Sequence, residues 1–245
     1  MEEGERKDTE MGTPQGSAIS PLLANIYLHY VFDLWVDVWR KKCARGDVVV
    51  VRYADDNVLG FQHRDEADRF LMEFRERLKK FGLELHPDKT RRIEFGRFAE
   101  HNRKQRGEGK PETFDFLGFT HISGKDRNGA SAVKRKTVSK RLRAKLLEVK
   151  QRLRRRMHEP VAQNGKWLRS IVQGYFNYHA VPGNIDSLSA FRYRVIRLWR
   201  TMLIHRGQKH HLTWERMGAL SDRWIPQPRV LHPYPGVRFD ATHPR

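Results

Sequence analysis

The stretch VVVVRYADDNVLGF, residues 48–61, most constrains what this chain can fold into. Two apolar runs separated by a short polar break are typical of two buried strands joined as a hairpin. The tip of such a hairpin favours Asn-Gly or Asp-Gly, because these residues tolerate a positive φ. Asp55 and Asp56 instead place two negative charges side by side at the tip. A solvated turn is one interpretation. A functional turn is the other, since local rules tend to be broken at functional sites.

Two amphipathic helices are predicted on either side of this hairpin. Residues 20–42 carry apolar side chains at helical spacing, with Ser20 as the N-cap and Pro21 at the first helical position, where its missing N–H costs nothing. Residues 65–82 have the same periodicity, with Asp65 as the cap and a glycine at the end. Each helix has one apolar face, so we expect both to pack against a core.

The remainder of the first half has strand-like patterns. LELHPDKTRRIEFG, residues 83–96, predicts a strand, a Pro-Asp turn and a second strand. Residues 99–112 are charged and lack periodicity, which is typical of a surface loop, and residues 113–123 predict one more strand pair. Helices packed on one face of a small, mostly antiparallel sheet make an α+β domain, which is the fold class that we expect.

Charge is distributed unevenly along the chain, whose formal net charge is +19. Residues 1–120 hold 21 Lys and Arg against 22 Asp and Glu, whereas residues 121–245 hold 27 against 7. Solubility alone would not segregate charge in this way, but a polyanionic partner would. The second half is therefore predicted to bind nucleic acid.

From about residue 134 the chain changes character. KRKTVSKRLRAKLLEVKQRLRRRMHE keeps its apolar residues on one side, and residues 165–180 and 186–207 predict two more amphipathic helices. Three helices with short connections make a small bundle. The proline-rich end that follows predicts an extended tail. The expected domains are residues 1–123, 134–210 and 211–245.

Composition excludes several classes of protein. No apolar stretch approaches the roughly 20 residues that cross a bilayer, so no membrane partner is expected. The start, MEEGERKDTE, is polar and acidic, unlike a secretory signal. The single cysteine, Cys43, excludes an internal disulfide and a zinc site with several cysteines. An intracellular protein is expected.

Four stretches follow one another in a characteristic order: GTPQGSAISPLLANIYLH (12–29), RYADDNVLGF (52–61), LELHPDKT (83–90) and FDFLGF (114–119). Together they resemble successive motifs in the palm of reverse transcriptases encoded by bacterial group II introns. GKWLRSIVQGYFNYHAVPGN resembles the thumb, or maturase-specific region, of the same proteins. The resemblance implies a partial polymerase palm with a YADD hairpin, then an all-α thumb and maturase bundle, in a protein of the bacterial cytoplasm.

The resemblance gives the two carboxylates of the hairpin a function. It implies RNA-directed DNA synthesis from an RNA template, a DNA primer and dNTPs, with Asp55 and Asp56 as ligands of catalytic Mg²⁺. Nucleotide addition is an in-line displacement that two Mg²⁺ ions assist, and Mg²⁺ takes hard oxygen ligands such as carboxylates. A tip fixed by two buried strands would supply the rigid placement that phosphoryl transfer needs.

Other positions match the family's motifs residue by residue. The residues that would contact template and nucleotide are Pro14, Gln15, Gly16 and Tyr53. Lys89 matches a lysine near the triphosphate, although an exposed turn lysine is an equal alternative. The residues that resemble the primer grip are Leu117, Gly118 and Phe119, although a plain core strand explains FLGF equally well. Arg52 receives no role.

The basic helix of the second half is predicted to bind RNA, and the resemblance implies that this RNA is a group II intron. Most polar residues of this helix are Lys or Arg, and their mutual repulsion destabilises the helix. Neutralisation of RNA phosphates therefore explains the clustered positive charge better than simple solvation does. The predicted RNA-binding residues are Lys134, Arg135, Lys136, Arg143, Lys150, Arg154, Arg155 and Arg156. The aromatic residues Trp167, Tyr175, Tyr178 and Trp199 are at helical spacing and are interpreted as core.

Departures from the family leave several functions open. Reverse transcriptases place a third carboxylate and the fingers before the PQG segment, and residues 1–11 contain no apolar strand. Asn57 also stands where the family usually has an aromatic or apolar residue. The chain is therefore a polymerase piece that needs an N-terminal fragment, a non-catalytic RNA-binding splicing factor, or a decayed relic.

Overall fold

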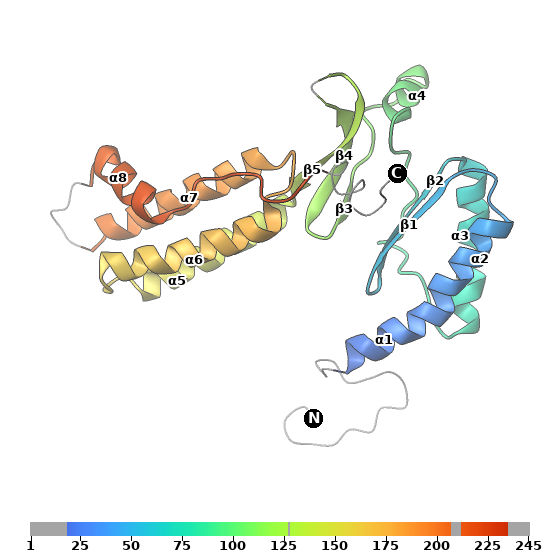
Figure 1. Cartoon of the computed structure of the whole chain (residues 1–245), viewed down its shortest axis with the longest axis horizontal. Coiled ribbons are helices and arrows are strands. Elements are labelled where there is room, and N and C mark those ends of the chain that lie inside the picture. The colour runs from blue at the N-terminus through green and yellow to red at the C-terminus, as the bar shows by residue number, and fades with distance from the viewer. Residues whose placement is uncertain (1–18, 127, 207–211, 235–245) are drawn as a thin grey trace. The chain divides into compact units, whose positions relative to one another are not determined.

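The computed structural model describes residues 19–126, 128–206 and 212–234 (Figure 1). It contains two compact units, Met1–Arg92 and Ile93–Arg245. Helices and small antiparallel sheets occur in both units, so the expected α+β class is confirmed. None of the described helices combines the length and the apolar character needed to cross a membrane.

The first predicted helix forms over the expected residues, with one irregular turn. It consists of α1 (Ser20–Leu28), the π-helical turn η1 (His29–Asp33) and α2 (Leu34–Lys42). Its N-cap residue is Ile19 rather than Ser20. Much of the apolar stripe of α1 is exposed: Leu22, Leu23, Ile26 and Tyr27 each retain at least two fifths of their accessible surface.

The predicted hairpin and second helix complete the first unit. Strands β1 (Val48–Tyr53) and β2 (Asp56–Phe61) pair antiparallel, and α3 (Arg64–Lys80) follows with His63 rather than Asp65 at its N-cap. One face of the hairpin packs with α2 and α3 because apolar residues alternate along the strands. The buried side chains of this core are Val31, Phe32, Val36, Trp39, Val48, Phe70, Phe74 and Leu78.

Two predictions for the segment after α3 were wrong. Residues 83–96 form no strands and instead run as an irregular segment, in which Thr90 donates its backbone N–H to the His86 carbonyl. Pro87 lacks the N–H that a strand ladder needs, and Leu83 and Leu85 gain burial against the core without a ladder. Part of the predicted loop at 99–112 is the short helix α4 (Ala99–Gln105), whose Ala99 is buried.

After α4, the second unit continues with a three-stranded antiparallel meander of β3 (Phe114–Phe116), β4 (Phe119–Lys125) and β5 (Ser131–Thr137). Lys134, Arg135 and Lys136 therefore lie on a strand and not at the start of the basic helix, which corrects the prediction for residues 134–136. The basic helix was predicted to begin at residue 134, whereas α5 begins at Ser139. Val133 and Thr137 are β-branched, and the ladder to β4 pairs every residue of this segment.

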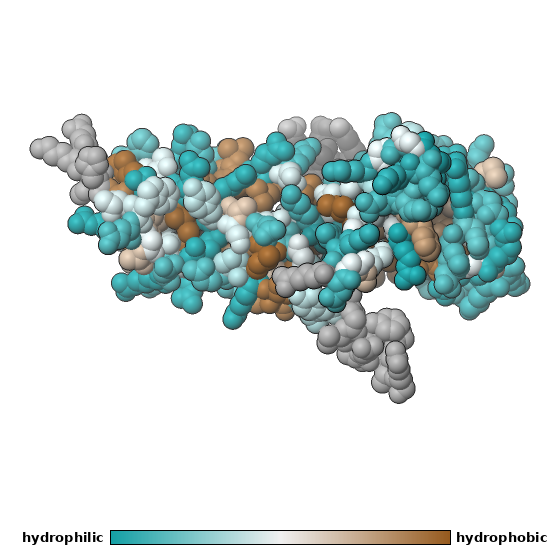
Figure 2. All heavy atoms as spheres, turned by 90° about the horizontal axis from the view of Figure 1, so that it is seen from above, coloured by the Kyte–Doolittle hydropathy of each residue, from teal (hydrophilic) through white to brown (hydrophobic). Residues whose placement is uncertain are grey.

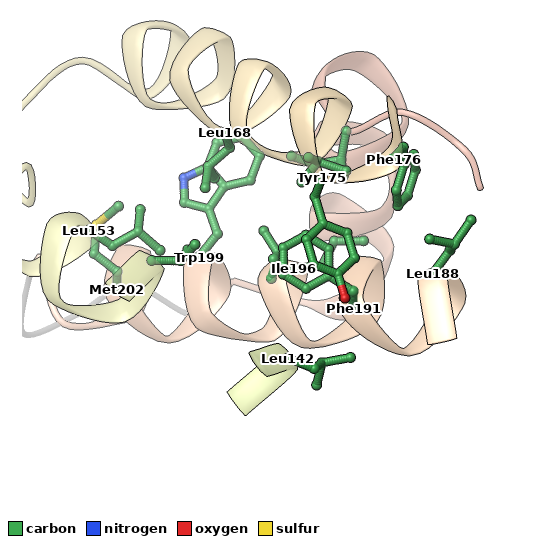
Figure 3. Close-up of a cluster of buried hydrophobic side chains, with 14 of the residues drawn as sticks. Leu142, Leu153, Leu168, Tyr175, Phe176, Leu188, Phe191, Ile196, Trp199 and Met202 are labelled. Carbon is green, nitrogen blue, oxygen red and sulfur yellow. The ribbon is translucent and has the colours of Figure 1, made fainter. Parts of the chain in front are cut away.

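Helices α5 (Ser139–Arg155), α6 (Val161–His179), α7 (Ile185–Ile204) and α8 (Trp214–Trp224) follow. The first three correspond to the predicted bundle, and their buried side chains interdigitate in one core (Figure 3). Trp199 has no exposed surface and Tyr175 is buried, so the core interpretation of both residues is confirmed. Tyr178, by contrast, is half exposed.

Helix α8 was missed by the sequence analysis, which assigned residues 211–245 to an extended tail. Thr213 caps this helix by accepting the backbone N–H of Arg216, and Met217 is fully buried. Gly165 of α6 makes room for α8, because a Cβ atom at this position would lie 2.6 Å from the Trp224 ring. The prolines begin only after α8 ends, so they did not indicate the structure before them.

A buried asparagine joins the sheet to the helices of this unit. Asn184 accepts the backbone N–H of Thr137 at 3.0 Å and donates to the Thr137 hydroxyl and the His179 carbonyl, each at 2.8 Å. A buried side chain whose polar atoms are all paired specifies a single arrangement of the elements that it connects. Asn184 thus fixes the end of β5 to the connection between α6 and α7.

Candidate functional site

The turn between β1 and β2 holds the two adjacent aspartates. Tyr53 pairs with Asp56, so only Ala54 and Asp55 form the loop. Ala54 has a φ of +54°, a left-handed conformation that costs a non-glycine residue about 1–2 kcal/mol. Such strain persists only where surrounding contacts fix the backbone, and it is concentrated at functional sites.

Arg52 supplies those contacts. Its Nη1 donates to the Ala54 carbonyl at 3.0 Å and to Asn25 Oδ1 at 2.8 Å. Its Nε and Nη2 donate to the two carboxylate oxygens of Asp33 at 2.7 and 2.6 Å. The planar guanidinium therefore fixes the turn to α1 and η1 through a bidentate ion pair.

The Arg52–Asp33 ion pair also affects the charges close to the turn. Hydrogen bonding from the Arg52 guanidinium lowers the pKa of the Asp33 carboxyl below its usual range. Asp33 in turn neutralises Arg52, which is only 16 % exposed. The positive charge of Arg52, the cation nearest the turn in sequence, is thus balanced by Asp33. Arg52 therefore does not neutralise Asp55 or Asp56.

Asp33 is the last residue of the π-helical turn η1. The backbone N–H of Leu34 donates to the His29 carbonyl, an i to i+5 bond that adds one residue to the turn. Val31 and Phe32 remain buried in the core while Asp33 faces the hairpin. Single π-helical turns inside α-helices are frequent at functional sites.

Asp55 and Asp56 are both exposed, as metal ligands that meet a substrate must be. Their oxygens match the preference of Mg²⁺ for hard donors. Among the residues that the structure describes, no group of three Asp, Glu, His or Cys side chains is arranged to hold a metal ion. The turn alone offers two carboxylates, so a metal ion bound there would need most of its ligands from other groups.

The other residues predicted near the polymerase site lie in different environments. Tyr53 is 64 % exposed at the end of β1, beside the turn. Lys89 is exposed in the irregular segment after α3, where its backbone N–H donates to the His86 carbonyl. Pro14, Gln15 and Gly16 lie outside the described residues.

The FLGF segment forms the turn between β3 and β4. Leu117 and Gly118 both have positive φ, +47° and +81°, as in the type I′ turns of two-residue hairpins. The Tyr178 hydroxyl donates to the Leu117 carbonyl at 2.8 Å, and the Val138 N–H donates to the Gly118 carbonyl at 3.1 Å. Phe119 is buried and stacks on Tyr178, with 5.9 Å between ring centroids. This turn is thus fixed to α6 and to the start of α5.

The predicted RNA-binding residues separate into exposed and internally paired groups. Arg156 pairs with Glu159, donates to Asn164 and lies over the Trp167 ring, so it stabilises the connection between α5 and α6. Arg135 is partly buried, and this burial lowers its pKa. The exposed members of the set are Lys134, Lys136, Arg143, Lys150, Arg154 and Arg155. Figure 2 shows that hydrophilic residues cover much of one face of the molecule.

Sequence reasoning missed three functional candidates. Arg52 was left without a role because its partners, Asn25 and Asp33, lie in a different element; the only local signal was an arginine inside an apolar strand. Arg194 and Arg197 of α7 were not included among the RNA-binding residues, although they are exposed. The signal in the sequence was the presence of four arginines on α7, of which Arg194 and Arg197 lie three residues apart.

Comparison with protein families finds a match in the first part of the chain. Residues 1–121 match the reverse transcriptase (RNA-dependent DNA polymerase) family. The matched segment contains the hairpin with Asp55 and Asp56, together with Arg52 and its partner Asp33. Helices α5 to α8 lie beyond the matched residues. A search of curated proteins gives no match to this chain.

Proposed function

We propose that this chain is part of a group II intron reverse transcriptase and maturase, and that its β1–β2 turn binds the metal ions of RNA-directed DNA synthesis. One observation carries the proposal: within the matched segment, a strained two-residue turn presents Asp55 and Asp56 to solvent. Arg52 holds this turn without pairing with either aspartate, so both carboxylates are available to cations.

In this proposal, Asp55 and Asp56 hold divalent ions, which would activate the primer hydroxyl and stabilise the charge that develops on the α-phosphate. The role of the hairpin is rigid placement, because positioning and electrostatic stabilisation supply nearly all catalysis of phosphoryl transfer. Tyr53, exposed beside the turn, is suited to contact the incoming dNTP or the template. The substrates are an RNA template, a DNA primer and dNTPs.

The remaining predicted contacts are part of the same proposal. Pro14, Gln15 and Gly16 would approach the template, and Lys89 would neutralise the leaving pyrophosphate. The turn formed by Leu117 and Gly118 would position the primer, and its hydrogen bonds to Tyr178 and Val138 support it as a fixed element. The family resemblance suggests each of these roles.

A second activity, binding of intron RNA to assist splicing, is favoured by the cations of the second unit. Arg143, Lys150, Arg154 and Arg155 are exposed on α5, and within the described part of the chain none of them forms an ion pair. Unpaired cations on one helix are suited to neutralise phosphates. A non-catalytic splicing factor would retain this activity alone, and a decayed relic would retain neither.

Primer extension on a poly-A template tests the proposal. We expect no product from the isolated chain with Mg²⁺, because two aspartates leave the ions under-coordinated. A polypeptide that carries reverse transcriptase fingers and a third carboxylate should restore synthesis, and the fingers polypeptide alone is the control. Asp55-dependent synthesis by the isolated chain would contradict the need for a partner. If no combination makes DNA while intron RNA still binds, the splicing-factor alternative is correct.

A further inference from the structure

The arginines of α7 divide into two groups with different surroundings. Arg192 pairs with Asp222 at 3.0 Å and donates to the Pro226 carbonyl, and Arg200 donates twice to the Leu212 carbonyl. These two arginines hold α8 and its flanking segments against α7. The guanidinium groups of Arg192 and Arg200 are therefore occupied by intramolecular hydrogen bonds.

Arg194 and Arg197 have no such role. Both are exposed, and they lie three residues apart, on the same side of α7. Lys150 of α5 faces the same groove. Within the described residues, no carboxylate forms an ion pair with Lys150, Arg194 or Arg197. Three unpaired cations around one groove repel one another, a cost that an anionic ligand would remove.

The groove between α5 and α7 has an apolar floor. Leu146 and Leu147 of α5 and Leu198 of α7 line it together with the three cations and Thr201. Leu147 is 55 % exposed, although a leucine at a helix–helix junction is ordinarily buried. The volume of the groove is about 450 Å³. Its lining offers both charge neutralisation and apolar contact along the helices.

An exposed aromatic ring lies on α7 next to the cations of the groove. Tyr193 is 55 % exposed, and the Arg197 guanidinium carbon lies 5.8 Å from its ring centroid. Sites for single-stranded nucleic acid combine a positively charged groove with aromatic and apolar surfaces that contact unpaired bases. In a duplex the bases are stacked inside, so a duplex could use the cations but neither Tyr193 nor the leucines.

We propose that the α5–α7 groove binds a single-stranded RNA segment. Lys150, Arg194 and Arg197 neutralise its phosphates, and Tyr193 and the leucine floor contact its bases and riboses. This inference rests on the proposed RNA-binding function, and it names residues of α7 that were not among the predicted RNA-binding residues. Because stacking accepts every base, the groove binds RNA with little sequence preference.

The test measures binding of the full chain to a labelled 12-nucleotide RNA and to a duplex of the same length. We expect Arg194→Glu with Arg197→Glu to weaken single-strand binding at least tenfold more than Arg216→Glu with Arg223→Glu, two exposed arginines of α8 that give the same charge change. Removal of two phosphate contacts should also flatten the slope of log K against log salt by about 1.4.

Tyr193→Ala separates stacking from charge. It should weaken single-strand binding by about fivefold or more and leave duplex binding unchanged. Equal effects of the α7 and α8 charge reversals, or equal losses of duplex and single-strand binding in Tyr193→Ala, would overturn the groove proposal while leaving RNA binding intact. Failure of the unmodified chain to bind either RNA would overturn the proposed function itself. Should a charge reversal disturb folding, the Arg194→Gln, Arg197→Gln variant gives the same comparison.

Discussion

In a reconstituted polymerase, Asp55→Ala is expected to lower RNA-templated DNA synthesis by about 100- to 1,000-fold or more, as for other positioned charge stabilisers. The physical reason is the loss of a metal ligand from a turn that has only two carboxylates. Primer extension with Mg²⁺ measures the effect. The matched control is Glu76→Ala, which removes another exposed carboxylate from the same unit.

The stability of the variant distinguishes a functional role from a structural one. Asp55 is exposed and next to another negative charge, so its replacement should leave the melting temperature within about 1–2 °C of the unmodified chain. Asp55→Asn, which keeps the shape and removes the charge, should lose synthesis equally. Unchanged synthesis in either variant would refute the assignment of Asp55 as a metal ligand.

The second large effect is expected from salt. If the second unit neutralises about six phosphates, log K for structured RNA falls with log salt at a slope of roughly −4 to −5, so binding weakens by about three to four orders of magnitude between 50 and 300 mM. A gel-shift or anisotropy titration at several salt concentrations measures this slope. Binding that does not change over this range would exclude an electrostatic interface.

A fourfold charge reversal locates the interface. Replacement of Arg143, Lys150, Arg154 and Arg155 with Glu should flatten the slope and weaken all RNAs alike, because phosphate contacts carry no sequence information. A matched reversal in the first unit provides the control. Its residues are Lys42, Arg75, Lys79 and Lys80, all exposed. Equal effects of the two reversals would mean that net charge, and not the basic face of α5, determines binding.

Elements with a strong local pattern could be predicted from the sequence. The β1–β2 hairpin and the helices α5, α6 and α7 could be predicted from apolar periodicity, because the residues that form this pattern all lie within the element itself. The strand at Lys134–Lys136 could not be predicted, because a basic, weakly alternating segment becomes a strand only by pairing with β4. Helix α8 depends in the same way on tertiary contacts, among them the space that Gly165 leaves for Trp224.

The part of the candidate site that lies within one short sequence motif could be predicted. Asp55 and Asp56 are adjacent in the sequence, so their place at a turn could be expected. The support of the turn by Arg52 could not be predicted, because its partner Asp33 is 19 residues away in sequence and lies in a π-helical turn that no local pattern indicates. The positive φ of Ala54 was equally hidden, since alanine gives no sign of a left-handed residue.

Binding of Mn²⁺ to the β1–β2 turn tests the central claim most directly, because it requires no partner polypeptide and no turnover. Backbone amide NMR signals of the full chain would be followed during a titration with Mn²⁺, whose unpaired electrons broaden signals near the ion. We predict that signals of residues 53–57 broaden first, recover in excess Mg²⁺, and stay sharp in the Asp55→Asn, Asp56→Asn variant. Turn signals that keep their intensity while those of the neighbouring acidic pair, Asp65 and Glu66, disappear would contradict a metal site at this hairpin.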